Sequence, residues 1–308
     1  MKKYILISLL IAFSFSFSIF FLFQQENWDT INPTVQNFYF QNSNKNNSNI
    51  LLLGSSHIGM LNASHIQLII NEKYPDHFVY NLAQSSDKPS KRIHELEQII
   101  SLNPKIILYG IGFRDFSSEY FIPTILPDPK QLTKIYFSEN SPDFLENPKL
   151  VTLNVIKNTL GYNNQLQNLE KNTPFFPYNS EYNQVTDLNE LEKKSNSNLS
   201  ITISNVEKNK DFIALQKIFS TLSKNSVSVL LLTPHNSYYF DSILTHDKEN
   251  FFKIINNIES NKNIQIHSLM HNYSNNNIWT SENHVTHSST GIQYNNDVAE
   301  IILNILET

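Results

Sequence analysis

Short runs of apolar residues recur along this chain, separated by longer stretches in which polar and apolar residues mix. Continuous apolar runs of this kind are typical of strands that are buried on both faces of a parallel sheet. We expect strands at residues 50–53, 78–82, 105–111, 226–232 and 264–268. The apolar pattern therefore predicts a central sheet made of segments from both halves of the chain.

Apolar residues spaced by three or four positions occupy the stretches between these runs. This spacing places them on one face of a helix. It predicts amphipathic helices at residues 62–73, 90–102, 211–223, 248–258 and 297–306. Strands that alternate with helices form βαβ units, which build a parallel sheet with helices on both faces. We therefore predict an α/β fold, a three-layer α/β/α sandwich.

The amino end carries a different apolar pattern. Lys2 and Lys3 precede an uncharged apolar run at residues 4–23, and about 20 such residues can span a bilayer as a helix. The two lysines predict that the amino end stays inside and that the rest of the chain lies outside the membrane. The run ends in bulky residues, without the small residues of a cleavage site, so we expect an uncleaved single-pass anchor.

These patterns divide the chain into parts. We expect an anchor at residues 1–25, a polar linker at 26–48 and one α/β domain at 49–308. Prolines punctuate a long polar and aromatic region inside that domain, which we interpret as an insertion at about residues 116–204. Local helices are predicted in it near 150–160 and 187–194.

Composition excludes several classes of function. The chain has no cysteine, so disulfides, thiolate metal sites and cysteine nucleophiles are excluded. Its net charge of -5 argues against nucleic acid as the main partner. His246, His267 and His271 lack the spacing of metal ligands, so we predict no metal site, and we expect no cofactor.

The candidate chemistry gathers where two predicted strands end. Gly54, Ser55, Ser56 and His57 directly follow the first strand, and Gly110 and Gly112 lie at the end of the third. Ligands of open α/β sheets bind outside the carboxyl ends of the strands. Glycine is needed where a backbone turns with positive φ or approaches a ligand closely. We therefore expect a site at this edge of the sheet.

These residues resemble the motifs of a known family. Gly54-Ser55-Ser56 resembles the first block of the SGNH (GDSL-type) hydrolases, in the Gly-Ser-Ser variant of membrane-anchored polysaccharide O-acetylation proteins. Gly112-Phe113-Arg114-Asp115 sits where the family has Gly-X-Asn-Asp, and residues 281–287 sit where it has Asp-X-X-His. The resemblance implies a flavodoxin-like sheet and makes Ser56 the nucleophile.

Three family positions differ in this chain, and two of them belong to the groups that stabilise the oxyanion. The glycine of the second block is missing, and Ala83, Gln84 and Ser85 occupy its region, where a backbone N–H can still donate. Arg114 replaces the asparagine that stabilises the oxyanion. A guanidinium offers donors in a fixed fork, so Arg114 can serve the oxyanion, hold an anionic substrate group or pair with an acid such as Asp115.

The late block offers two histidines as the base. Aligning His284 puts Ser281 at the position of the family's aspartate, but Glu282 is adjacent and can orient the ring, so we favour His284 with Glu282. His287 is the alternative, and it would put His284 at that position. His57 can line the pocket or only begin a helix. His235 follows the fourth strand and is a further candidate for substrate contact.

The resemblance implies a serine esterase or O-acyltransferase that acts on an acylated glycan or a similar cell-envelope polymer outside the membrane. Ser56 would attack the ester carbonyl, and the histidine would act as base and then as acid. The alternative is a catalytically degenerate domain of the same fold that binds glycan or takes part in envelope assembly. The missing glycine, asparagine and aspartate favour this alternative.

Overall fold

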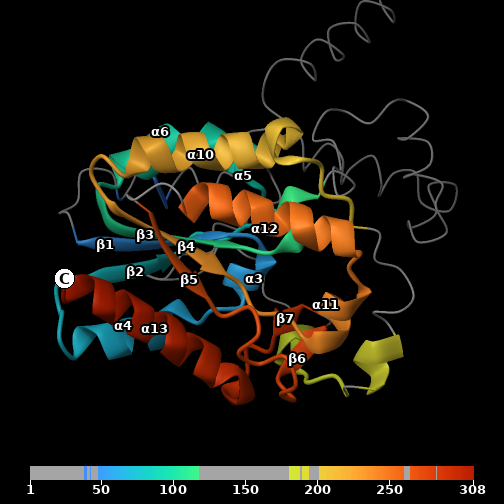
Figure 1. Ribbon diagram of the computed structural model, residues 1–308. Coiled ribbons are helices and arrows are strands. Elements are labelled where there is room, and N and C mark those ends of the chain that lie inside the picture. Colours follow the sequence, from blue (N-terminus) through green and yellow to red (C-terminus); the bar gives the residue numbers. More distant parts are fainter. Residues whose placement is uncertain are drawn as a thin grey trace, which may run out of the picture. The chain divides into compact units, whose positions relative to one another are not determined.

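The computed structural model describes residues 38–39, 42, 48–117, 180–187, 189–193, 201–259, 264–281 and 283–308 (Figure 1). All of them belong to one of two compact units, formed by residues 37–120 and 168–308. The predicted anchor and most of the predicted linker and insertion, including the helix expected near 150–160, lie outside the described residues. Within the described ranges, no helix is long and apolar enough to cross a membrane.

Five strands form one parallel sheet, which confirms the predicted α/β fold. They are β1 (Asn49–Gly54), β2 (Phe78–Asn81), β3 (Pro104–Ile111), β4 (Val227–Leu232) and β5 (Ile264–Ser268), in the order β2-β1-β3-β4-β5. The chain moves outward from β1 to β2 and then returns to the other side of β1 with β3. The strand order therefore reverses between β1 and β3, which is where such sheets bind ligands.

The strand β1 lies at the centre of the core. It pairs with β2 on one side and with β3 on the other. The side chains of Ile50 to Leu53 are 0% exposed, on both faces of the sheet. A strand that is covered on both faces has no polar positions along it, which explains why this segment reads as one unbroken apolar run.

Helices cover both faces of the sheet (Figure 1). On one face lie α4 (Ala63–Asn71) and α13 (Ile292–Leu306), and on the other α10 (Lys210–Leu222) and α12 (Thr245–Glu259). The helix α13 begins five residues before the predicted start at 297. Two consecutive asparagines, Asn295 and Asn296, are more typical of a loop than of a helix. Asn295 is nevertheless buried in the helix, where it accepts a hydrogen bond from the backbone N–H of Asn62 at 2.7 Å.

The predicted helix at 90–102 is interrupted. It consists of α5 (Pro89–Arg92), the 3₁₀ turn η1 (Ile93–Glu95) and α6 (Leu96–Ser101). The break lies at Glu95, whose φ of -97° and ψ of 6° leave the helical range. The Glu95 carboxylate accepts hydrogen bonds from Arg92 at 2.9 Å, Gln84 at 2.6 Å and Tyr39 at 3.0 Å. This buried polar network holds Glu95 in its non-helical conformation.

Several short elements were not predicted. They are α3 (Ser56–Gly59), α11 (Ser237–Ser242), the antiparallel pair β6 (Trp279–Ser281) and β7 (His284–Val285), and the 3₁₀ turns η2 (Phe113–Phe116), η3 (Ser180–Asn183), η4 (Val206–Lys208) and η5 (Ser289–Gly291). Residues 189–193 are helical, inside the helix predicted at 187–194. Both ends of the predicted insertion join the core, because Ser117 and Ile203 are buried and form an antiparallel bridge.

Candidate active site

The turn after β1 places Ser56 at the reversal of strand order. Gly54 has φ +140°, and a Cβ there would lie 2.5 Å from the carbonyl oxygen of Gly110 on β3. Only glycine tolerates this combination. The close approach lets β1 end against β3, so Ser56 begins α3 half-buried at the edge of the sheet.

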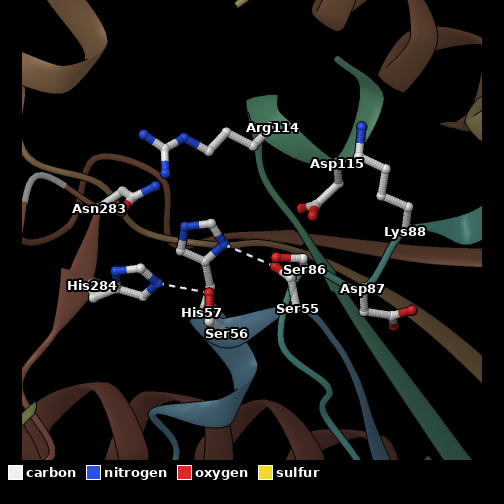
Figure 2. Close-up of a pocket in the computed structure, with 10 residues that line it drawn as sticks. All are labelled: Ser55, Ser56, His57, Ser86, Asp87, Lys88, Arg114, Asp115, Asn283 and His284. Atoms are coloured by element: carbon white, nitrogen blue, oxygen red, sulfur yellow. Dashed lines mark hydrogen bonds between the residues drawn. The ribbon is translucent and has the colours of Figure 1, made fainter. Parts of the chain in front are cut away.

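His284 is the histidine that contacts Ser56. The distance from Ser56 Oγ to His284 Nε2 is 2.6 Å (Figure 2). On the other side of the ring, the distance from His284 Nδ1 to Ser281 Oγ is 2.7 Å. A serine and a histidine at this distance are the geometry of a nucleophile with its base. Glu282, the acid expected to orient the base, lies outside the described residues.

His287 does not contact Ser56 but forms hydrogen bonds that join other parts of the fold. Its Nδ1 lies 3.1 Å from the Met60 carbonyl oxygen, and its backbone N–H donates to the Tyr182 carbonyl at 2.9 Å. Burial lowers the pKa of His287, which favours the neutral ring that donates to Met60. Of the two histidines that the sequence offered as base, the structure brings only His284 to Ser56.

The hairpin of β6 and β7 holds His284 and Ser281 side by side. These two residues are paired across its turn. The hairpin is anchored by Trp279, whose side chain is buried in the core and whose indole N–H donates to the Tyr273 carbonyl at 3.2 Å. The side chains at the tip of the hairpin can therefore keep fixed positions against Ser56.

His57 lies against the proposed base. Its ring stacks on His284 with 5.1 Å between centroids, and its Nδ1 lies 3.1 Å from Ser55 Oγ. Burial lowers the pKa of His57 well below its ordinary value, and His284, Arg114 and His235 lower it further. His57 is therefore neutral in this pocket at physiological pH, and it does more than begin a helix.

Asp115 is a buried acid beside these residues. Burial raises its pKa to about 7, while the hydrogen bonds from the Gly112 N–H, at 2.6 Å, and from Ser55 oppose the rise. In Figure 2 the Asp115 carboxyl group and the Arg114 guanidinium point in different directions, the latter toward Asn283. The guanidinium also lies 5.7 Å from the ring centre of Tyr239.

We expect Asp115 to contribute a fall in the free energy of unfolding as the pH rises from about 4 to about 7, and the Asp115→Asn variant to lose this contribution. The unfolded chain releases the Asp115 proton near pH 3.9, roughly the ordinary value, whereas the folded chain keeps it up to about pH 7. Between these values the folded state binds more protons, so a rising pH favours unfolding, by on the order of 2–4 kcal/mol. Urea unfolding at several pH values measures this, and equal pH dependence in both proteins would contradict it.

One small pocket connects these groups. Its volume is about 80 Å³, and residues 55–57, 86–88, 114–115 and 283–284 line it (Figure 2). The first three segments follow β1, β2 and β3, and the fourth belongs to the β6–β7 hairpin. Their convergence agrees with the site expected at the carboxyl edge of the sheet.

The region of the second family block differs from what we expected. The N–H of Ala83 donates to the Asn81 side chain at 3.1 Å, and the N–H of Gln84 donates to the Gly54 carbonyl at 3.1 Å. Neither group is aimed at Ser56. Ser85 is exposed, and its neighbour Ser86, which has φ 55°, lines the pocket.

His235 lies behind the pocket. It is buried, and its ring stacks on Phe240 with 5.2 Å between centroids. Burial lowers its pKa to about 4. His235 is not among the residues that line the pocket, so the substrate contact considered for it from the sequence is not supported.

Four pocket residues were missed by sequence reasoning: Ser86, Asp87, Lys88 and Asn283. The first three follow β2, in the region where the family glycine is missing, and no motif in that region marks them as site residues. Asp87 is ion-paired with Arg92 at 2.7 Å, and burial raises its pKa to about 6. Lys88 is buried and donates to the Ser117 carbonyl.

A comparison with protein-family models finds no match to this chain, and a comparison with curated proteins finds none either. In the part of the chain that the structure describes, no group of three or more histidine, aspartate or glutamate side chains is placed to hold a metal ion.

Proposed function

We propose that this chain is a serine-dependent esterase or O-acyltransferase of the SGNH-like type, in a three-layer, flavodoxin-like α/β/α domain. The observation that supports it best is the 2.6 Å contact between Ser56 Oγ and His284 Nε2, at the reversal of strand order. The 2.7 Å contact of His284 Nδ1 with Ser281 adds to it, because a base needs a partner that fixes its tautomer.

In the proposed reaction, Ser56 Oγ attacks the carbonyl carbon of an ester and its proton passes to His284 Nε2. The oxyanion receives a hydrogen bond from the backbone N–H of Ser56, which has no acceptor within α3 because it lies in the first turn. Arg114 faces the same pocket and adds positive charge. His284 then gives its proton to the departing alcohol oxygen, and water or an acceptor hydroxyl releases the acyl group from Ser56.

The pocket supports a short acyl group. Its roughly 80 Å³ is smaller than the ~150 Å³ of an engineered cavity that accepts benzene, so an acetyl-sized group suits it best. We propose an acylated glycan or envelope polymer as the substrate, since the motifs resemble those of polysaccharide O-acetylation proteins. The apolar run at residues 4–23 would anchor the domain to the bilayer, with the site on the outer side.

The second candidate is a non-catalytic domain that binds glycan or assists envelope assembly. Two observations favour it: the N–H groups of Ala83 and Gln84 are used within the fold, and the Ser281 hydroxyl contacts His284 Nδ1 at the family's aspartate position. A hydroxyl stabilises an imidazolium less than a carboxylate does. The two candidates differ in whether Ser56 is activated.

Covalent labelling with a fluorophosphonate probe tests the proposal. We expect the full-length protein in mild detergent to react at Ser56, and the Ser56→Ala variant to lose the label, because only an activated serine attacks the probe at a useful rate. The Ser64→Ala variant is a matched control, since Ser64 is an exposed serine of α4 and should leave labelling unchanged. A wild type that does not label would favour the binding domain.

A further inference from the structure

Asn283 has a buried amide group that faces the candidate site. The residue is 2% exposed and lines the pocket together with Ser56 and His284. Its Nδ2 has no hydrogen-bond partner among the described residues. In Figure 2 this nitrogen points toward His57, on the side where the Arg114 guanidinium ends.

An unpaired buried donor needs an explanation. Most buried polar groups in proteins are hydrogen-bonded, and leaving one unpaired costs about 1–3 kcal/mol. An amide in the wall of a pocket recovers this cost when a ligand supplies an acceptor. Asn283 is therefore prepared for a ligand oxygen.

The orientation of the amide is linked to the protonation of His284. For Nε2 to take the proton of Ser56, Nδ1 must carry the ring proton and donate it to Ser281 Oγ, at 2.7 Å. Ser281 then directs its own hydrogen to Asn283 Oδ1, at 3.4 Å. The reversed amide would donate to Ser281, and Ser281 would then donate to Nδ1, which gives the wrong tautomer for a base. The state that activates Ser56 is thus the state in which Asn283 Nδ2 faces the pocket.

We propose that Asn283 Nδ2 donates a hydrogen bond to the carbonyl oxygen of the bound acyl group and to the oxyanion that forms from it. This inference rests on the proposed function. It assigns to the β6–β7 hairpin an amide donor of the kind that the family has at the position of Arg114. It also supplies a donor that the N–H groups of Ala83 and Gln84 do not. One hairpin then provides both the base and an oxyanion donor.

The Asn283→Asp variant separates the two roles of the amide, because its carboxylate still accepts from Ser281 but cannot donate to an oxyanion. With p-nitrophenyl acetate and the full-length protein in detergent, we expect kcat to fall about 100- to 1,000-fold with little change in KM. The Asn283→Ser variant gives a second measurement if the aspartate disturbs folding. The Ser281→Ala variant keeps the amide and removes the link to His284, so it should instead alter the pH profile of kcat/KM.

The outcomes distinguish this inference from the proposed function. If wild type hydrolyses the ester, Ser56→Ala does not, and Asn283→Asp loses kcat as expected, the inference is supported. If Ser56 is required but folded Asn283 variants keep kcat within about tenfold of wild type, less than an oxyanion donor contributes, the inference fails and the proposed function stands. If wild type shows no Ser56-dependent hydrolysis or labelling, both fail.

Discussion

The His284→Ala variant is expected to hydrolyse p-nitrophenyl acetate at least about 1,000-fold more slowly than wild type, near pH 8. The reason is the 2.6 Å contact between His284 Nε2 and Ser56 Oγ, which places the ring to take the serine proton. Without the ring, Ser56 keeps the proton of an ordinary hydroxyl and is a weak nucleophile. Steady-state kinetics of the full-length protein measure the effect, with thermal melting to show that the variant is folded.

The His287→Ala variant is the matched control for this experiment. Its ring contacts the Met60 carbonyl oxygen, so we expect lower stability but a kcat close to that of wild type. Equal loss of kcat in the two variants would contradict the assignment of His284 as the base. A loss confined to His287→Ala would move the base to that residue.

The Arg92→Met variant is expected to lose about 3–5 kcal/mol of the free energy of unfolding at pH 8. The Arg92 side chain is fully buried and paired with Asp87 at 2.7 Å and Glu95 at 2.9 Å, and it also donates to the Leu82 carbonyl at 3.0 Å. Removing the guanidinium leaves two buried acids without their cation. For a domain of this size the melting temperature should fall by about 6–20 °C, which circular dichroism can follow.

The pH dependence of this loss identifies its cause. Without Arg92, which lowers the pKa of Asp87, the folded-state pKa of Asp87 should rise, so this acid stays protonated to higher pH. The loss should therefore be smaller at pH 5 than at pH 8. Lys91→Met changes the neighbouring cation of α5, which donates to the carbonyl of exposed Ser86 at 3.2 Å, and should cost less than about 0.5 kcal/mol. An equal cost for both variants would contradict a special role for Arg92.

The sheet could be predicted because β1, β3 and β4 are apolar runs that are followed by a glycine or polar residue. Every predicted strand is present, and no end differs from the expected one by more than one residue. Helix bounds were less predictable where polar side chains are buried. Glu95 interrupts one helix because three partners hold its carboxylate, and Asn295 belongs to another because it bonds Asn62. Such partners are distant in sequence, so no local pattern reveals them.

The pairing of Ser56 with His284 could be predicted from the sequence, since the serine follows the central strand and the histidine lies in the late block. The role of Ser281 and Asn283 was not. A hydroxyl and an amide in an Asn-rich loop carry no pattern that separates them from their neighbours. Only the β6–β7 turn, which sets Ser281 opposite His284, shows that they form one hydrogen-bonded chain.

The two residues of the proposed nucleophile–base pair are 228 positions apart in the chain. Ribosomes make Ser56 early and His284 late, so a growing chain carries the serine through most of its synthesis without a partner. In the folded domain α13, which follows His284, lies against α4, where Asn295 and Asn296 bond Asn62 and His65. Ester chemistry at Ser56 would therefore have to wait until the last part of the chain has been made and has folded onto the first.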